Sequence, residues 1–217
     1  MKKPIARQSC ASATFLVIVL MMLANVASAC GFHSPLGLRQ TMLDWQYPGA
    51  LWVNSAIMTG QESGALAKPN AKRLKATGAE REFRDNIAFA AVTRALRAFD
   101  VGFKARSEQS GHPDISLVLL DTMLWTRYSA DGTMELHSGF AEVTDFVVVT
   151  GEPVIHAIES GQLTVAAAVE AGYMRLYGSN VQQNNFLSSY GLLGAKPLPK
   201  IDRRSLNVQM LQSNPAG

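Results

Sequence analysis

The stretch DFVVVTGEPVIHAIESGQLTVAAAVEAGYMRLYG, residues 145–178, contains the clearest succession of strand-like and helix-like segments in this chain. Phe146 and the three valines that follow it predict a hydrophobic strand over residues 145–150, because β-branched and aromatic side chains are favoured in strands. The apolar positions in residues 152–159 favour a short helix. The first half of the stretch therefore predicts a strand followed by a helix.

The second half of the stretch predicts another helix and another strand. Thr164 is a suitable N-cap for a helix over residues 165–171, and Gly172 can end that helix in a left-handed conformation. Residues 173–177 favour a short strand, which Gly178 would end.

A long amphipathic helix is predicted upstream, over residues 79–106. Its apolar side chains recur at steps of three and four, as they do on the buried face of a helix. These side chains are Phe89, Val92, Leu96, Phe99 and Phe103, and Phe83 and Ile87 extend the apolar face toward the start of the helix.

The segment between the long helix and the quoted stretch favours β-structure. Residues 114–129 are rich in large apolar side chains and predict one largely buried strand, with a bulge near Asp121 and Thr122. An Asp-Gly turn at residues 130–133 then leads to a returning strand over residues 134–140.

These elements divide the chain into four parts. We expect a signal peptide at residues 1–29, an N-terminal extension at 30–78, an α+β domain at 79–194, and a flexible tail at 195–217 that is disordered or draped on the surface. The extension should contain a short helix over residues 50–59, ended by Gly60, and the domain should close with a helix over residues 182–190.

The first 29 residues have the three parts of a secretory signal. Basic residues precede an apolar run over residues 13–26, and Ala27-Ser28-Ala29 supplies the small side chains that a signal peptidase requires. Cleavage after Ala29 would make Cys30 the first residue of an exported protein. The same residues approximate a lipobox, so Cys30 is either acylated or a free N-terminal thiol. The expected location is the periplasm, or the outer membrane if Cys30 carries a lipid anchor. Gly31 rather than Asp follows the cysteine, and resemblance to enterobacterial lipoproteins would then suggest sorting to the outer membrane.

Loss of the signal changes the charge of the protein. The chain carries 20 basic and 17 acidic residues, and the signal contains three of the basic residues and none of the acidic ones. The exported chain is therefore neutral, which argues against nucleic acid and anionic lipid surfaces as partners. One of the two cysteines also leaves with the signal, so we expect no internal disulfide.

The order of elements over residues 80–190 resembles the sterol carrier protein type 2 family. The residues that carry the resemblance are the strand, the helix ending in Gly161-Gln162-Leu163, the alanine-containing helix, and the strand between Gly172 and Gly178. The resemblance implies an α+β fold with a mixed or antiparallel sheet and helices packed on one face. It also implies an apolar tunnel that takes fatty acyl chains, sterols, quinones or similar ligands.

Eleven apolar residues would line such a tunnel, and the alternative is that they fill a solid core. They come from the long helix, the sheet and the helices that follow it. The candidates are Phe89, Leu96, Phe99, Leu117, Leu119, Trp125, Val147, Ile155, Ile158, Val169 and Phe186.

The sequence contains no catalytic signature. We find no nucleophile elbow, Walker loop, dinucleotide fingerprint or metalloprotease helix, and we expect no catalytic residue and no cofactor. Cys30 and His33 form the one candidate metal-ligand pair, and acylation would remove the thiol. The other histidines, His112, His137 and His156, show no metal-ligand spacing.

The sequence therefore favours an exported, non-enzymatic envelope protein that binds a lipid or another apolar small molecule and is tethered to the membrane if Cys30 is acylated. Two alternatives remain open. The chain could be a structural docking protein with a partner in an envelope complex, or a metal-handling protein that uses Cys30 and His33.

Overall fold

The computed structural model describes residues 43–69, 71, 75–107, 114–142 and 144–200. The predicted signal, the lipidation site Cys30 and the metal-ligand pair Cys30 and His33 lie outside the described residues, as do His112 and most of the tail. No helix in the described part of the chain is both long enough and apolar enough to span a membrane.

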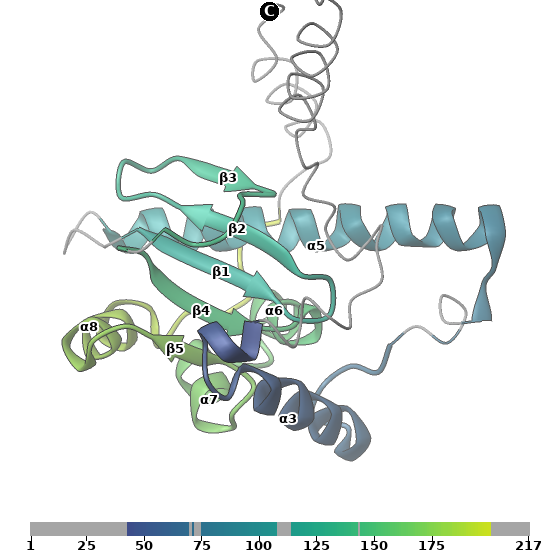
Figure 1. Cartoon of the computed structure of the whole chain (residues 1–217), viewed down its shortest axis with the longest axis horizontal. Helices are drawn as coiled ribbons and strands as arrows, with labels where there is room; N and C mark the ends of the chain where they lie inside the picture. Colours follow the sequence, from purple (N-terminus) through teal and green to yellow (C-terminus); the bar gives the residue numbers. More distant parts are fainter. Residues whose placement is uncertain (1–42, 70, 72–74, 108–113, 143, 201–217) are drawn as a thin grey trace, which may run out of the picture.

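The centre of the fold is a five-stranded mixed sheet (Figure 1), which confirms the predicted α+β class. The central strands β1 and β4 are parallel, and the remaining neighbours are antiparallel. In spatial order the strands are β3 (Met134–Leu136), β2 (Leu124–Tyr128), β1 (Ile115–Leu119), β4 (Phe146–Thr150) and β5 (Arg175–Tyr177).

The single strand predicted over residues 114–129 is wrong, because the structure has two antiparallel strands there. Leu119 pairs with Leu124, and the residues between them form a tight turn in which Met123 has a φ of 51°. All five residues of β1 and most of β2 are buried. The apolar run therefore continues through both strands, and the sequence pattern gives no sign of the turn between them. Asp121 lies in this turn and accepts a hydrogen bond from the Glu152 amide at 3.2 Å, which ties the hairpin to the next helix.

The returning strand β3 is shorter than the predicted 134–140. It ends at Leu136, before His137, whose φ of 59° is incompatible with an extended strand. The predicted strand over residues 145–150 is present as β4, and all five of its residues are buried.

The long helix is confirmed as α5 (Gly78–Ser107), which runs along the sheet and extends well beyond it at one end (Figure 1). The second half of the helix carries the residues that pack on the sheet, including Leu96 and Phe99, which are almost fully buried. Residues 78–91 include none that is buried, and Phe83 and Ile87 are exposed.

The helices of the quoted stretch follow the prediction closely. They are α6 (Glu152–Glu159) and α7 (Val165–Glu170), and the Thr164 hydroxyl accepts a hydrogen bond from the Ala167 amide at 3.1 Å. The last helix, α8 (Asn180–Tyr190), begins two residues before the prediction, because Ser179 and Gln182 form a capping box.

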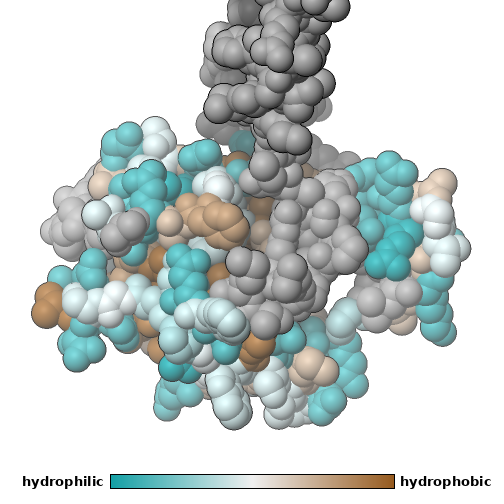
Figure 2. All heavy atoms as spheres, viewed as in Figure 1, coloured by the Kyte–Doolittle hydropathy of each residue, from teal (hydrophilic) through white to brown (hydrophobic). Residues whose placement is uncertain are grey.

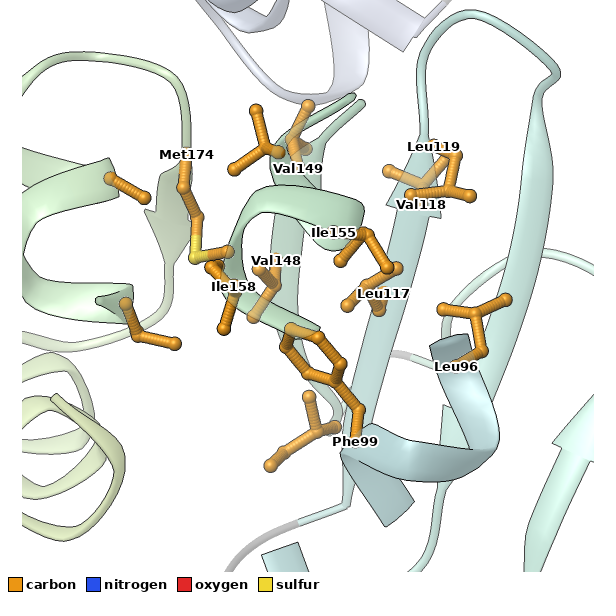
Figure 3. Packing of buried hydrophobic residues seen from close by; sticks show 14 of the residues in the cluster. Leu96, Phe99, Leu117, Val118, Leu119, Val148, Val149, Ile155, Ile158 and Met174 are labelled. Atoms are coloured by element: carbon orange, nitrogen blue, oxygen red, sulfur yellow. The ribbon is translucent and has the colours of Figure 1, made fainter. Parts of the chain in front are cut away.

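One face of the sheet is covered by α5, α6 and α8, as predicted. Leu117 on β1 lies toward Ile155 of α6 and Phe99 of α5 (Figure 3). The Tyr128 hydroxyl donates a hydrogen bond to the Leu96 carbonyl at 3.0 Å, and this contact links β2 to α5 across the same face.

The N-terminal extension packs on the opposite face. The rings of Tyr47 and Trp125 lie 6.1 Å apart and those of Tyr47 and Tyr177 lie 5.2 Å apart. Helix α3 (Ala50–Ser63) follows and contacts β4. Buried side chains of the extension join the same core as the domain: Leu43, Ala50, Val53, Ile57 and Leu66.

The predicted end of this first helix at Gly60 is wrong. The helix continues to Ser63, and Gly64, with a φ of 82°, is the residue that ends it. Gly60 has a packing role instead, because a Cβ at this position would lie 2.8 Å from the Tyr173 hydroxyl oxygen. At the other end of the chain, residues 195–198 lie against α6, and the Leu198 amide donates a hydrogen bond to the Glu159 carbonyl at 2.8 Å.

Candidate ligand-binding groove

A groove of about 600 Å³ lies where α3, α7, β5 and α8 meet, an arrangement that can be followed in Figure 1. Each of these four elements contributes side chains to it. The lining residues are Trp52, Val53, Ser55, Ala56, Thr59, Val169, Gly172, Met174, Arg175, Leu176, Gln183 and Leu187.

Helix α3 forms one wall of the groove. Val53 is buried, whereas the Trp52 side chain is 74% exposed, so the indole is accessible to solvent beside the apolar lining. Ala56 and Thr59 continue the wall at one and two turns from Trp52. This wall therefore combines apolar area with the small side chains that leave room for a ligand.

The other walls come from the stretch that follows the sheet. Met174 and Leu176 are buried, and Val169 and Leu187 are partly buried. Gly172 lies beside Ala56 of α3, since a Cβ at this position would be in ordinary van der Waals contact with the Ala56 Cβ, at 3.7 Å. The φ of Gly172, 73°, also satisfies the predicted end of α7.

Hydrogen bonds hold the β5 side of the groove in place. The Thr150 hydroxyl donates to the Tyr173 carbonyl at 2.9 Å, and the Tyr177 hydroxyl reaches the Tyr47 and Pro48 carbonyls at 3.2 Å each. Burial raises the pKa of Tyr177 to about 12, so its phenol stays protonated and remains a donor at neutral pH. The groove is thus preformed by the fold.

Arg175 is the charged residue in the lining of the groove. Its guanidinium carbon lies 5.8 Å from the centre of the Tyr177 ring, on the side of the sheet where α3 packs. Its guanidinium also lies against Gly49, the residue that precedes α3, since a Cβ there would meet Nη1 at 2.7 Å.

Most of the predicted ligand-binding residues lie in the interior rather than at the groove. Six of them pack together between the sheet and the helices α5 and α6, all at most 1% exposed (Figure 3): Leu96, Phe99, Leu117, Leu119, Ile155 and Ile158. Trp125 and Val147 are buried on the opposite face of the sheet.

The remaining three predicted residues are divided between different surroundings. Phe186 belongs to an aromatic cluster, with its ring centre 5.0 Å from that of Phe146. Phe89 is partly buried, with its ring centre 5.1 Å from that of His137. Val169 is the one residue of the eleven that lines the groove.

Sequence reasoning missed the α3 wall because the extension has no counterpart in the family that the chain resembles. A signal was nevertheless available. Trp52, Ala56 and Thr59 follow one another at steps of four and three, which places them on one side of a helix. Arg175 was missed because a single arginine in a short strand carries no pattern.

Two clusters of titratable side chains lie outside the groove. His156 approaches Glu159 at 3.2 Å and Glu152 at 3.7 Å, and the hydrogen bond with Glu152, followed by that with Glu159, raises the pKa of the histidine despite its burial. In the described part of the chain no three His, Cys, Asp or Glu side chains are placed to hold a metal ion.

The second cluster is an ion network on the face of the sheet that Trp125 occupies. Arg127 contacts Asp114 at 2.8 Å and the buried Asp145 at 3.1 Å, and it also bonds Glu142. Asp145 accepts a further hydrogen bond from the Ser116 hydroxyl. The network joins the start of β1, strand β2 and the segment before β4, and we assign it a structural role.

Apolar groups are dispersed on the face of the molecule seen in Figure 2. Hydrophobic side chains form small separate groups among hydrophilic ones in the described residues visible there. The described residues visible on that face therefore form no broad apolar patch, whereas the groove offers a concave surface with a largely apolar lining.

Comparison with known proteins gives matches among solved structures only. No protein-family model matches the chain, and no curated protein matches it. Sterol carrier protein 2-like 2 from Aedes aegypti matches with a TM-score of 0.37 and 14% identity, over 48% of this chain and 96% of that protein.

Two further matches are structures of a sec-alkyl sulfatase. The stereoselective inverting enzyme Pisa1 from Pseudomonas sp. gives a TM-score of 0.28 and 18% identity over 36% of this chain, and a double mutant of PisA1 gives 0.30 and 18% over 37%. The chain spans only 12% and 13% of those two proteins. At these scores the three likenesses do not establish a family for the chain.

Proposed function

We propose that this protein binds a lipid or another apolar ligand, without transforming it, in the groove between α3, α7, β5 and α8. The groove itself is the observation that carries the proposal. Its volume of about 600 Å³ is in the range of small-molecule sites, and its lining is mainly apolar with a few polar groups.

The lining chemistry suits a flexible chain better than a polar metabolite. A buried methylene group contributes roughly 0.8 kcal/mol, so a decyl chain in the groove offers at most about 8 kcal/mol before the cost of association. We therefore expect dissociation constants in the micromolar range or weaker for single-chain ligands.

Tryptophan fluorescence can test the proposal with 1-decanol as the probe. Trp52 lines the groove, Trp125 is buried on the sheet, and Trp45, which is 85% exposed, adds background that a Trp45→Phe variant removes. In that variant, decanol should shift the Trp52 emission to shorter wavelength in a saturable manner, because the indole loses contact with water.

A matched pair of variants locates the binding. Ala56→Phe places a ring in the groove and should weaken decanol binding by about tenfold or more, the equivalent of roughly two buried methylenes. Ala90→Phe adds the same ring to an exposed position on α5 and should leave the affinity unchanged. No saturable binding, or the same loss in both variants, would contradict the proposal.

We also propose that the chain is exported and held at a membrane through Cys30. The support is the basic, apolar and small-residue succession over residues 1–29 and the cysteine directly after it. A tether would raise the effective concentration of a lipid binder near its ligand source. The mass of the mature chain, purified after expression with its own signal, distinguishes an acylated Cys30 from a free thiol.

A further inference from the structure

We infer that the groove selects amphiphiles with a single anionic headgroup, and that Arg175 is the residue that recognises this headgroup. The inference rests on the proposed ligand binding and names the class of ligand. It follows from the position of one cation in a lining whose other members are apolar or uncharged.

The side chain of Arg175 has no carboxylate partner within the described residues. By contrast, Arg84 pairs with Glu80 at 2.7 Å, and Arg127 is surrounded by three carboxylates. No ion pair joins Arg175 to Asp44, a residue that precedes α3 and whose carboxylate accepts a hydrogen bond from the Leu51 amide at 3.0 Å. The guanidinium beside the groove therefore keeps its donors available for a ligand.

The surroundings of Arg175 restrict where its guanidinium can lie. The guanidinium carbon lies 5.8 Å from the centre of the Tyr177 ring. The guanidinium also lies so close to the Gly49 backbone that a side chain at position 49 would overlap it. An ordered, planar guanidinium can form two parallel hydrogen bonds with one carboxylate. An anionic headgroup bound there would leave its alkyl chain to contact Met174, Leu176 and the other apolar residues of the lining.

Decanoate and 1-decanol test the inference, because the two probes share a chain and differ in headgroup charge at neutral pH. A charge-assisted hydrogen bond contributes about 1.5–3 kcal/mol, so wild type should bind decanoate about tenfold or more tightly than decanol. In Arg175→Gln this ratio should fall to about one, and Arg175→Lys should give an intermediate ratio because it keeps the charge and loses the fork.

Arg81→Gln is the matched control, since it removes the same charge from an exposed position on α5 and should keep the wild-type ratio. Circular dichroism establishes that each variant is folded. Equal affinities for the two probes in wild type would overturn the headgroup inference and leave the proposed function intact, whereas no binding of either probe would overturn both. Competition by acetate at concentrations equal to those of decanoate would indicate a simple anion site and would also overturn the inference.

Discussion

Replacement of Leu117 by alanine separates the two interpretations of the apolar interior, a solid core and a ligand tunnel. Leu117 is 1% exposed, and it lies on the central strand β1 between Thr126 and Val148. Removal of a buried leucine side chain costs about 2.7–5.0 kcal/mol, depending on how far the surroundings collapse. Since neighbouring strands hold β1 on both sides, collapse is restricted and we expect a cost of about 3–4 kcal/mol.

Thermal and urea unfolding measure this cost. In a domain of this size it corresponds to a decrease in Tm of about 6–16 °C. Leu192→Ala is the control, because that side chain is 70% exposed and its loss should change the stability by less than about 0.5 kcal/mol. A cost below about 1 kcal/mol for Leu117→Ala, together with weaker decanol binding, would refute the packed core and favour a tunnel at this position.

Three further predictions concern other parts of the chain. The two flanking glutamates raise the pKa of His156 above its ordinary value of 6.5, so its stabilising contribution should be complete below pH 6.5 and should disappear as the pH rises through the raised value. Urea unfolding across this pH range should show a weaker pH dependence in His156→Gln, and an unchanged dependence would contradict the assignment. Gly194→Ala should cost more than about 2 kcal/mol in thermal unfolding, because Gly194 has a φ of 90° and a Cβ would overlap the Leu163 carbonyl oxygen. Cys30→Ser should move the exported protein from the detergent-extracted membrane fraction to the soluble fraction, and an unchanged distribution would argue against acylation.

The elements that sequence predicted best are those whose signals are local. Thr164 caps α7 through a contact within its own first turn, and Gly172 ends the same helix through its own backbone conformation. The parallel pairing of β1 with β4 is different, because it joins residues 115–119 to residues 146–150 and leaves no local pattern. The tight turn between Leu119 and Leu124 was missed for a different reason, since both of its strands are buried and together look like one apolar strand.

Candidate site residues were harder to predict than the fold. The resemblance directed attention to apolar residues of the sheet and of the helices packed on it, and ten of the eleven lie away from the groove. The groove exists because α3 approaches α7 and β5, so that Ala56 lies beside Gly172. No sequence pattern indicates this approach. Only Val169 is both a predicted ligand-binding residue and a residue that lines the groove.

The sequence by itself determined the α+β class, the extents of α5 and α6, and the caps of α7, because periodicity, capping and glycine conformation act over a few residues. Tertiary structure alone decided the strand order, the packing of the N-terminal extension on the free face of the sheet, and the position of Arg175 beside a groove. These features arise when segments distant in the sequence come into contact, as β1 does with β4 and Tyr47 does with Tyr177. Contacts of that kind depend on the burial of the whole chain, and no short window of sequence contains them.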